Sequence, residues 1–320
     1  MQNAMLPLVE TKDLKKYFRV PDGWLHAVDG INISIDAGMT LGIVGESGCG
    51  KSTLGRLLLQ LLEPTDGIIR FQQKDVSSPN KGQLKELRKD MQMIFQDPYS
   101  SLNPRMTVAE IISEPMRRYR LYKGAELRER VVNLMNTVGL EQRLENSYPH
   151  ELDGGRRQRI GIARALALEP KFVVCDEPVS ALDVSIQAQI LNLMMDLQEE
   201  YGLTYMFITH DLSVVKHISD EIAVMYLGQI VEQSPADRLF EQPRHPYSQA
   251  LLSAIPRPKI RKEQQRIILK GEISSPINPT PGCRFAPRCI HAVDACRTQN
   301  QELIEVDQGH FVACQRYDEI

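Results

Sequence analysis

The stretch from Gly45 to Thr53, GESGCGKST, has the residue types that bind nucleotide phosphates. It fits the pattern G-x-x-x-x-G-K-[ST] and follows an apolar run from Thr40 to Val44, so a strand leads into the loop. Its glycines let backbone N–H groups turn toward phosphate oxygens, Lys51 adds a point charge and Ser52 offers a hydroxyl to Mg²⁺. The helix expected from Leu54 to Leu62 directs its partially positive N-terminus at the same phosphates. The predicted phosphate-binding positions are Gly45, Glu46, Ser47, Gly48, Cys49, Gly50, Lys51, Ser52 and Thr53.

Polar side chains follow two further apolar runs that have the character of buried strands. Gln96 comes directly after Met91 to Phe95, and its amide oxygen could reach Mg²⁺ or an attacking water. Asp176 and Glu177 end the run that starts at Lys171; Asp176 could bind Mg²⁺ through water and Glu177 could polarise a nucleophilic water. A solvated glutamine and an ordinary acidic pair at a strand end are the alternatives.

A histidine and an aromatic pair complete the candidate nucleotide contacts. His210 follows the apolar run from Tyr205 to Thr209, and ligands gather where parallel strands end, so we expect it to sense the γ-phosphate. A structural histidine is the alternative. Tyr17 and Phe18 precede the loop and offer a flat apolar surface on which adenine could stack, although packed core aromatics would have the same sequence.

A second helix start in the chain is also suited to an anion. Asp153, Gly154 and Gly155 stand before a basic helix with regularly spaced apolar residues. An ordinary helix capped by Asp153 explains the same pattern. Further on, the Ser180–Asp183 segment opens a helix rich in Leu, Ile and Met.

The pattern of the remaining chain predicts an α/β fold. Alternating residues in the first forty positions predict short antiparallel strands, and a helical period runs from Thr107 to about Leu140. A hairpin is expected at Leu227-Gly228. The chain thus combines a P-loop NTPase core with an antiparallel β-subdomain and a helical subdomain.

Composition excludes several classes of protein. With a net charge of −3, the 320 residues give no electrostatic reason to expect nucleic-acid binding. No apolar run approaches the roughly 18 residues of a membrane span, and residues 1–13 lack the apolar centre of a signal peptide. We therefore expect a soluble, cytosolic chain.

The C-terminal tail contains a cluster of four cysteines. After Pro256 the composition shifts to proline and charge, which predicts a small loop-rich extension. The cysteines follow C-x5-C-x6-C-x17-C, and zinc sites favour closer pairs, so a [4Fe-4S] cluster is the first expectation, zinc the second and free thiols the third. A structural or regulatory role is expected rather than electron transfer. The four positions are Cys283, Cys289, Cys296 and Cys314.

Taken in order, these motifs resemble the nucleotide-binding subunits of ATP-binding cassette (ABC) transporters over roughly residues 8–255. The resemblance implies a head-to-tail dimer in which each ATP lies between one subunit's P-loop and the other's Gly-Gly signature. It further implies that Phe18 or Tyr17 stacks on adenine, that Ser52 and Gln96 serve Mg²⁺, that Gln96 couples to the membrane partner, and that Glu177 is the general base. Asp183 would link the two sites and His210 would contact the γ-phosphate. Residues 1–255 are then the nucleotide-binding domain, with a helical subdomain at about 100–165, and 256–320 the extension.

Three further segments resemble the oligopeptide and dipeptide uptake branch of that family. They are FQDPYSSLNPR around Gln96, HPYSQALLSAIP from His245 to Pro256, and GCRFAPRC from Gly282 to Cys289. The short span from the P-loop to Gln96 is similar to the second of two paired ATPase subunits. This implies a paralogous ATPase partner in a hetero- or homodimer, two membrane permeases, an external solute-binding protein, and a peripheral location on the inner face of the cell membrane. Related importers carry nickel or oligosaccharides, so the solute stays open.

The signature departs from the family's usual LSGGQ at Asp153. The usual serine hydroxyl donates to the γ-phosphate held by the opposite subunit, whereas a carboxylate repels it. At ~4 Å and an effective dielectric near 20, two unit charges interact by about 4 kcal/mol. We therefore hypothesise that the partner's site is slower than this chain's own site, with Arg156 offsetting part of the repulsion. A neutral replacement in which Asp153 only caps the helix is the alternative.

Two other functions fit parts of the sequence. A cassette ATPase of translation or repair would keep the nucleotide motifs, but the single cassette, the lack of a basic stripe and the tail disfavour it. A generic P-loop kinase has no need of the Gly-Gly signature or His210. ATP hydrolysis that powers solute import is therefore the expected activity.

Overall fold

The computed structural model describes residues 6–255, 267–269, 271 and 275–320, without the side chain of Pro98. The chain forms two compact units, one of residues 1–78 with 207–320 and the other of residues 79–206. The strand β9 (Thr204–Ile208) crosses the division.

The first unit begins with an antiparallel sheet of order β2-β1-β5-β6, in which β3 also pairs with β1. Its leading hairpin turns at Pro21-Asp22, and its two strands are antiparallel as predicted but long rather than short. Val9, Thr11 and Leu14 are buried along β1, and the register shift between Lys12 and Lys15 interrupts the alternation. The strands are β1 (Val9–Val20), β2 (Gly23–Ile31), β3 (Ser34–Ile35), β5 (Asp66–Phe71) and β6 (Lys74–Asp75).

Parallel strands carry the phosphate-binding loop in the same unit. Strand β4 (Thr40–Val44), buried at every position, pairs in parallel with β10 (Glu221–Tyr226) and leads through the loop into α1 (Lys51–Leu58). The helix therefore begins three residues before the expected Leu54, because Gly50 at φ 109° is its N-cap. The predicted hairpin at Leu227-Gly228 is confirmed: β10 pairs antiparallel with β11 (Gln229–Pro235).

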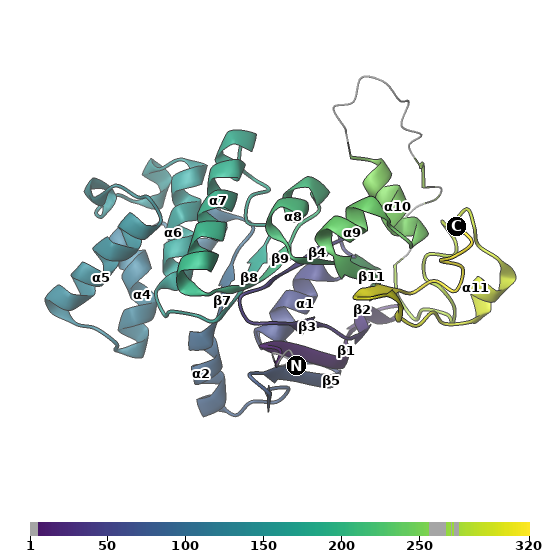
Figure 1. Cartoon of the computed structure of the whole chain (residues 1–320). Helices are drawn as coiled ribbons and strands as arrows, with labels where there is room; N and C mark the ends of the chain where they lie inside the picture. The colour runs from purple at the N-terminus through teal and green to yellow at the C-terminus, as the bar shows by residue number, and fades with distance from the viewer. Residues whose placement is uncertain (1–5, 256–266, 270, 272–274) are drawn as a thin grey trace, which may run out of the picture. The chain divides into compact units, whose positions relative to one another are not determined.

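The C-terminal extension adds two short strands beside that hairpin (Figure 1). Strand β13 (His310–Val312) pairs with β11, and β12 (Ile304–Asp307) pairs with β13. The described residues of the extension also contain α11 (Asp294–Thr298), and the rest of them lie mainly in turns and loops. The expected start of the extension at 256 falls on residues 256–266, outside the described residues.

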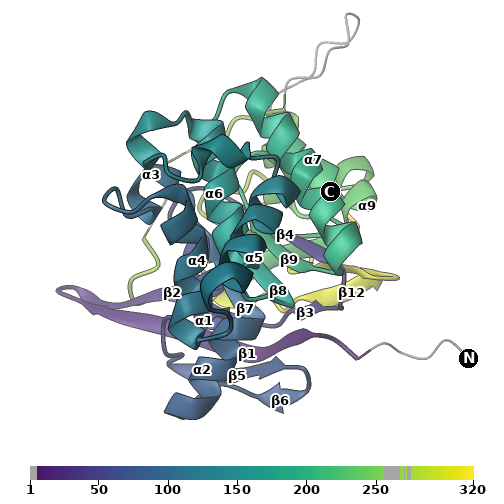
Figure 2. The same cartoon turned by 90° about the vertical axis from the view of Figure 1, so that its left-hand side faces the viewer.

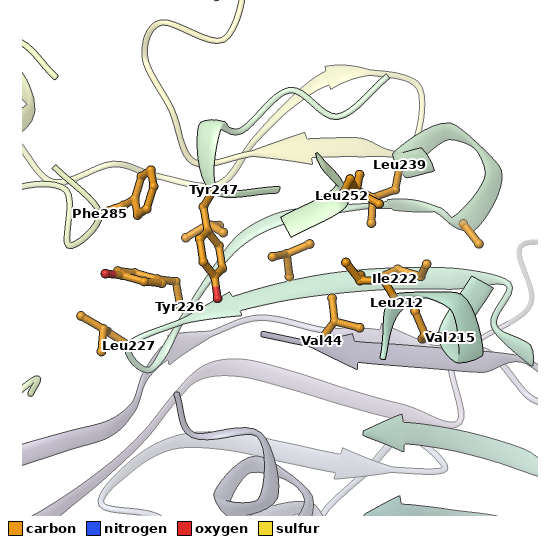
Figure 3. Packing of buried hydrophobic residues seen from close by; sticks show 13 residues of the cluster. Val44, Leu212, Val215, Ile222, Tyr226, Leu227, Leu239, Tyr247, Leu252 and Phe285 are labelled. Carbon is orange, nitrogen blue, oxygen red and sulfur yellow. The ribbon is translucent and has the colours of Figure 1, made fainter. Parts of the chain in front are cut away.

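An apolar cluster joins the extension to the body of the first unit. Phe285 of the extension is buried against Tyr226 of β10 and Tyr247, with ring centroids 5.3 and 5.4 Å away (Figure 3). The same cluster includes Val44 at the end of β4. The helices that contribute to it are α8 (Leu212–Ile218), α9 (Ala236–Glu241) and α10 (Pro246–Ser253).

The second unit is mainly helical around two parallel strands, β7 (Met91–Ile94) and β8 (Phe172–Asp176). The predicted helical stretch forms α4 and α5, which pack against each other and against α6 (Figure 2). A capping box of Thr107 and Glu110 starts α4, and one of Asn80 and Gln83 starts α2. The helical segments are α2 (Lys81–Asp90), α3 (Pro98–Ser101), α4 (Val108–Tyr119), α5 (Gly124–Thr137), η1 (Gln142–Leu144), η2 (Pro149–Glu151), α6 (Gly154–Leu166) and α7 (Val184–Tyr201).

Within the described residues, no helix has both the length and the apolar character that a bilayer span requires.

Candidate functional site

The loop between β4 and α1 is held closed by its own lysine. Lys51 is buried, and its ammonium donates to the carbonyls of Gly45 and Glu46 at 2.8 and 3.0 Å. Ser52 and Thr53 follow it in the first turn of α1. The ammonium and the start of the helix therefore lie at one small loop, which is the arrangement that phosphate binding requires.

Two glycines of this loop lie against backbone that leaves no room for a side chain. A Cβ on Gly45 would come within 2.1 Å of the Met225 carbonyl oxygen, and one on Gly50 within 2.1 Å of the Ala27 carbonyl oxygen. Both also have φ values in the left-handed range, 153° and 109°. The glycine spacing predicted from sequence is thus required by close backbone approach as well as by the turn.

Residues that the sequence analysis did not single out hold Glu46 of the loop. Its N–H donates to the Tyr247 hydroxyl at 2.9 Å, and its carboxylate accepts from both terminal nitrogens of Arg288 at 2.6 and 3.1 Å. Both partners belong to segments quoted for their resemblance to peptide importers, but no local pattern connects positions so far apart in sequence.

The aromatic pair lies on β1 in the same unit. The Tyr17 ring stacks on His26 with centroids 3.8 Å apart, and its hydroxyl donates to Asp29. Burial, followed by the hydrogen bond to Asp29, raises the pKa of Tyr17. Lys16 lies over the Phe18 ring at 5.2 Å. Among the described residues, Phe18 makes no such stack with another ring.

In the second unit, two predicted residues touch. Gln96 follows β7 and Glu177 follows β8, and the Gln96 amide donates to a Glu177 carboxylate oxygen at 2.9 Å. Glu177 has φ 47°, in the left-handed range that non-glycine residues rarely adopt. Strained backbone of this kind is frequent at functional sites. Asp176 is buried at the end of β8.

The Gly-Gly segment starts α6 with Asp153 as its N-cap. One Asp153 oxygen accepts from the Arg156 N–H at 2.8 Å and the other from the Arg156 guanidinium at 2.6 Å. Partial burial opposes ionisation, but the Arg156 N–H and charge outweigh it and lower the pKa of Asp153. The cap that the sequence suggested is present, and the Arg156 guanidinium pairs with the same carboxylate. Asp153 is therefore a carboxylate near neutral pH.

The start of α7 packs closely on this segment. A Cβ on Gly155 would lie 2.8 Å from Ile186, and one on Gly154 3.0 Å from Leu182. Asp183 is the N-cap of α7, and the Gln187 amide donates to the carbonyls of Val179 and Leu182, closing the turn between them. Gly154, Gly155 and Asp183 thus lie in one neighbourhood.

His210 is exposed in the first unit, just after β9, where the backbone N–H of Thr209 donates to the Ile43 carbonyl at 3.2 Å. That bond places the end of β9 beside Ile43 of β4. Ile43 is the next-to-last residue of β4, the strand that leads into the P-loop.

The four C-terminal cysteines line one small cavity, with Phe285, Ala286 and Pro246 among its apolar walls. All four thiols are free, and burial raises the pKa of Cys283 to about 11. Within the described ranges, no three Cys, His, Asp or Glu side chains are gathered as ligands of a single metal ion. The thiols therefore share a cavity without forming a one-ion site.

Comparisons with known proteins agree with these motifs. The family described as ABC transporter matches residues 28–180, and the family described as oligopeptide/dipeptide transporter, C-terminal region, matches residues 231–296. The chain is 51% identical to the oligopeptide transport ATP-binding protein AppF of Bacillus subtilis, over 97% of both chains. It is 50% identical to the oligopeptide transport ATP-binding protein OppF of Escherichia coli, over 97% of this chain and 96% of that one.

A solved structure extends the similarity to the fold. The ATP-binding cassette MJ0796, in a dimeric post-hydrolysis state bound to ADP and Pi, is 30% identical, with a TM-score of 0.65. The match covers 71% of this chain and 98% of that one. The chain therefore belongs to the ABC transporter ATPases, in the branch of oligopeptide and dipeptide transport ATP-binding proteins.

Proposed function

We propose that this chain hydrolyses ATP to drive the uptake of dipeptides and oligopeptides through an ABC importer. The observation that carries the proposal is about 50% identity to oligopeptide transport ATP-binding proteins along nearly the whole chain, the four-cysteine tail included. A translation or repair ATPase would share the nucleotide motifs but would have no use for the peptide-transporter tail.

The loop of the first unit binds the ATP phosphates in this proposal. The ammonium of Lys51 leaves the carbonyls of Gly45 and Glu46 for the β- and γ-phosphates, and the loop N–H groups and the start of α1 supply the remaining donors. Phe18 or Tyr17 stacks on adenine, and His210 contacts the γ-phosphate. Ser52, Gln96 and Asp176 offer hydroxyl, amide and carboxylate oxygens, the donor set that suits Mg²⁺.

Glu177 acts as the general base in the second unit. The Gln96 amide holds its carboxylate at 2.9 Å, and the left-handed backbone sets its direction. A base so positioned accepts a proton from the attacking water. The family resemblance further assigns to Gln96 the coupling of this site to the membrane partner.

Two ATPase subunits form the catalytic assembly. The Asp153–Gly155 segment faces the γ-phosphate on the partner's P-loop, and Asp183 links the two sites. The dimeric cassette MJ0796 supports this arrangement by similarity. The assembly binds two permeases on the inner face of the membrane and receives solute from an external binding protein, so the chain is a peripheral membrane subunit.

The four cysteines hold a [4Fe-4S] cluster in a structural or regulatory role, with zinc as the second candidate. Four thiols lining one apolar-walled cavity fit a cluster, because its four irons are ligated at separate corners and need no convergence on one ion. Loading would require the thiols to lose their protons. The expected signs are brown colour and visible absorbance that disappear in Cys289→Ser, whereas a colourless anaerobic preparation with one zinc would refute the cluster.

Co-purification tests the importer assignment. We expect the tagged chain, extracted from membranes in mild detergent, to bring with it two strongly hydrophobic subunits in equal amounts. The matched control is the same preparation from cells that lack those subunits. Recovery with ribosomes or DNA-repair proteins and without membrane subunits would overturn the proposal in favour of the non-transport alternative.

A further inference from the structure

Two arginines of the extension connect the four-cysteine loop to the nucleotide-binding part of the first unit. Arg284 and Arg288 both lie between Cys283 and Cys289. Arg284 donates to the Asp29 carboxylate and to the Leu227 carbonyl. Arg288 forms a two-point pair with Glu46 of the P-loop.

The pair of Arg288 with Glu46 is built as an internal contact. The Arg288 side chain is only 9% exposed and that of Glu46 23% exposed. The hydrogen bonds to Glu46 outweigh burial and raise the pKa of Arg288, which is therefore charged at any ordinary pH. Two parallel bonds between a guanidinium and a carboxylate fix direction as well as distance. Removing one partner of such a pair leaves the other charge without a counter-charge and with little water to hydrate it.

Glu46 is held on three sides, and each side belongs to a different segment. Its carboxylate is held by Arg288 of the extension, its N–H donates to Tyr247 of α10, and its carbonyl accepts from Lys51. The last contact involves the ammonium that phosphates recruit. The position of Glu46 therefore affects both the curvature of the loop and the direction of Lys51.

The other end of this connection is the cysteine cavity. The backbone N–H groups of Arg288 and Cys289 both donate to the Phe285 carbonyl at 3.0 Å, so one tight turn carries the arginine and the thiol. Cys283 begins the same turn and is tied by its N–H to the Cys296 carbonyl at 2.7 Å. Phe285 anchors the turn by packing against the rings of both Tyr226 and Tyr247 (Figure 3).

We propose that Arg288 is a positioning residue that sets the P-loop through Glu46, and that it transmits the state of the four-cysteine cavity to the nucleotide affinity of this subunit. The inference rests on the proposed ATP site at Gly45–Thr53. It assigns the extension a part in binding ATP, since Cys289, whose thiol lines the cavity, directly follows Arg288 in the chain.

The test titrates the purified full chain with a fluorescent ATP analogue, mant-ATP. Arg288→Met and Glu46→Gln should each raise its dissociation constant about tenfold, as expected for one charged hydrogen-bonded pair. The double variant should be no weaker than either single variant, because both remove the same contact. Arg288→Lys should recover part of the affinity, and kcat at saturating ATP should change much less than KM.

Arg238→Met is the matched control. Arg238 also binds the extension, at the Gln308 carbonyl, but among the described residues it forms no hydrogen bond or ion pair with the P-loop. Its dissociation constant should equal that of the wild type. Near-ultraviolet circular dichroism checks that Arg288→Met is folded. If it is not, the test uses the exchanged pair Glu46→Arg with Arg288→Glu instead. This double variant should bind mant-ATP more tightly than Glu46→Arg alone, because it restores the ion pair.

A separate set of variants tests the proposed link between the cysteines and nucleotide affinity. Cys289→Ser should weaken mant-ATP binding in the wild-type background and should have no further effect on Arg288→Met. Equal affinities for wild type, Arg288→Met and Cys289→Ser would overturn the inference while leaving the ATP site intact. A wild-type chain that does not bind mant-ATP at all would instead overturn the site on which the inference rests.

Discussion

At the scale of single residues, the hydrogen bond from Gln96 to Glu177 fixes the position of the proposed general base. A glutamate at a strand end is common. Glu177 differs because its backbone is in the left-handed region and because Gln96, a second strand-end residue, holds its carboxylate by a hydrogen bond of 2.9 Å. Replacing it by its amide preserves the shape and the hydrogen bond to Gln96 while removing the base.

Glu177→Gln should therefore lower ATP hydrolysis by about 10²- to 10⁴-fold, the range for loss of a general base. Binding of mant-ATP should stay close to that of the wild type. Steady-state phosphate release and fluorescence titration measure the two quantities. Hydrolysis within a few-fold of wild type would remove Glu177 from the proposed role.

Asp153 presents a charge where the partner's γ-phosphate is expected. Its carboxylate is partly neutralised by Arg156, which contacts both oxygens. The net effect on the partner's site is the difference between repulsion by Asp153 and attraction by Arg156.

The partner's site can be isolated in a heterodimer whose own site on this chain is disabled by Glu177→Gln. Asp153→Ser should then raise the remaining hydrolysis several-fold, because serine still caps α6 and also donates a hydroxyl to phosphate. Asp153→Asn, which keeps the cap and removes the charge, is the control and should give a smaller rise. Identical rates in all three proteins would support the alternative that Asp153 serves only as a cap.

The same heterodimer compares the two sites directly. Disabling this chain's base should cost more hydrolysis than disabling the equivalent base of the partner, because the partner's site faces Asp153. Equal losses would contradict the asymmetry.

His245, which caps α10, makes the stability of the first unit pH-dependent. Burial lowers the pKa of His245 to about 4, and its Nδ1 accepts from the Tyr247 N–H at 3.1 Å. Between pH 6.5 and 4 the unfolded chain therefore binds a proton that the folded chain does not. The stabilisation is fully present above pH 6.5 and is lost as the pH falls through that window.

From these values, the free energy of unfolding should fall by about 2 kcal/mol between pH 7.5 and pH 5 on account of this group. His245→Asn keeps an acceptor at the cap and cannot titrate, so its loss over the same range should be smaller by that amount. Urea unfolding of both proteins at the two pH values measures the difference. Parallel losses would show that His245 is not the titrating group.

At the scale of elements, strands with continuous apolar runs could be predicted from the sequence, since a strand that is buried along its whole length is apolar at nearly every position. Strands β4, β8 and β9 end where the runs end or one residue from it. The start of α1 could not be placed, because Lys51, Ser52 and Thr53 break the apolar pattern while Gly50 caps the helix. Strand β13 has only three residues and exists through its pairing with β11, which no local pattern encodes.

The close approach at Gly50 gives a prediction about the loop as an element. Gly50→Ala should abolish measurable mant-ATP binding, because a methyl group would meet the Ala27 carbonyl oxygen at 2.1 Å and the start of α1 must move. Gly38→Ala is the control: it has a positive φ of 79° but no atom within 4 Å of the added carbon. It should destabilise the fold by about 1 kcal/mol and leave nucleotide binding intact. Equal loss of binding in both would point to general destabilisation.

At the scale of the whole molecule, the sequence could predict the motifs but not the contacts that join distant segments. Glu46 lies 201 positions before Tyr247 and 242 before Arg288, yet both side chains contact it in the first unit. Each is unremarkable within its own segment. The same holds for Arg284 and Asp29, which connect the extension to the β1–β2 hairpin. Such pairs are set by the fold as a whole.

The central claim is that this P-loop powers peptide import, and transport by the reconstituted complex tests it most directly. Membrane vesicles that contain both ATPase subunits, the permeases and the binding protein should accumulate a labelled tripeptide only with ATP. Lys51→Met should abolish that accumulation, since the proposal assigns phosphate binding to this lysine. Uptake that persists in Lys51→Met, or stimulation by nickel or an oligosaccharide but by no peptide, would contradict the account.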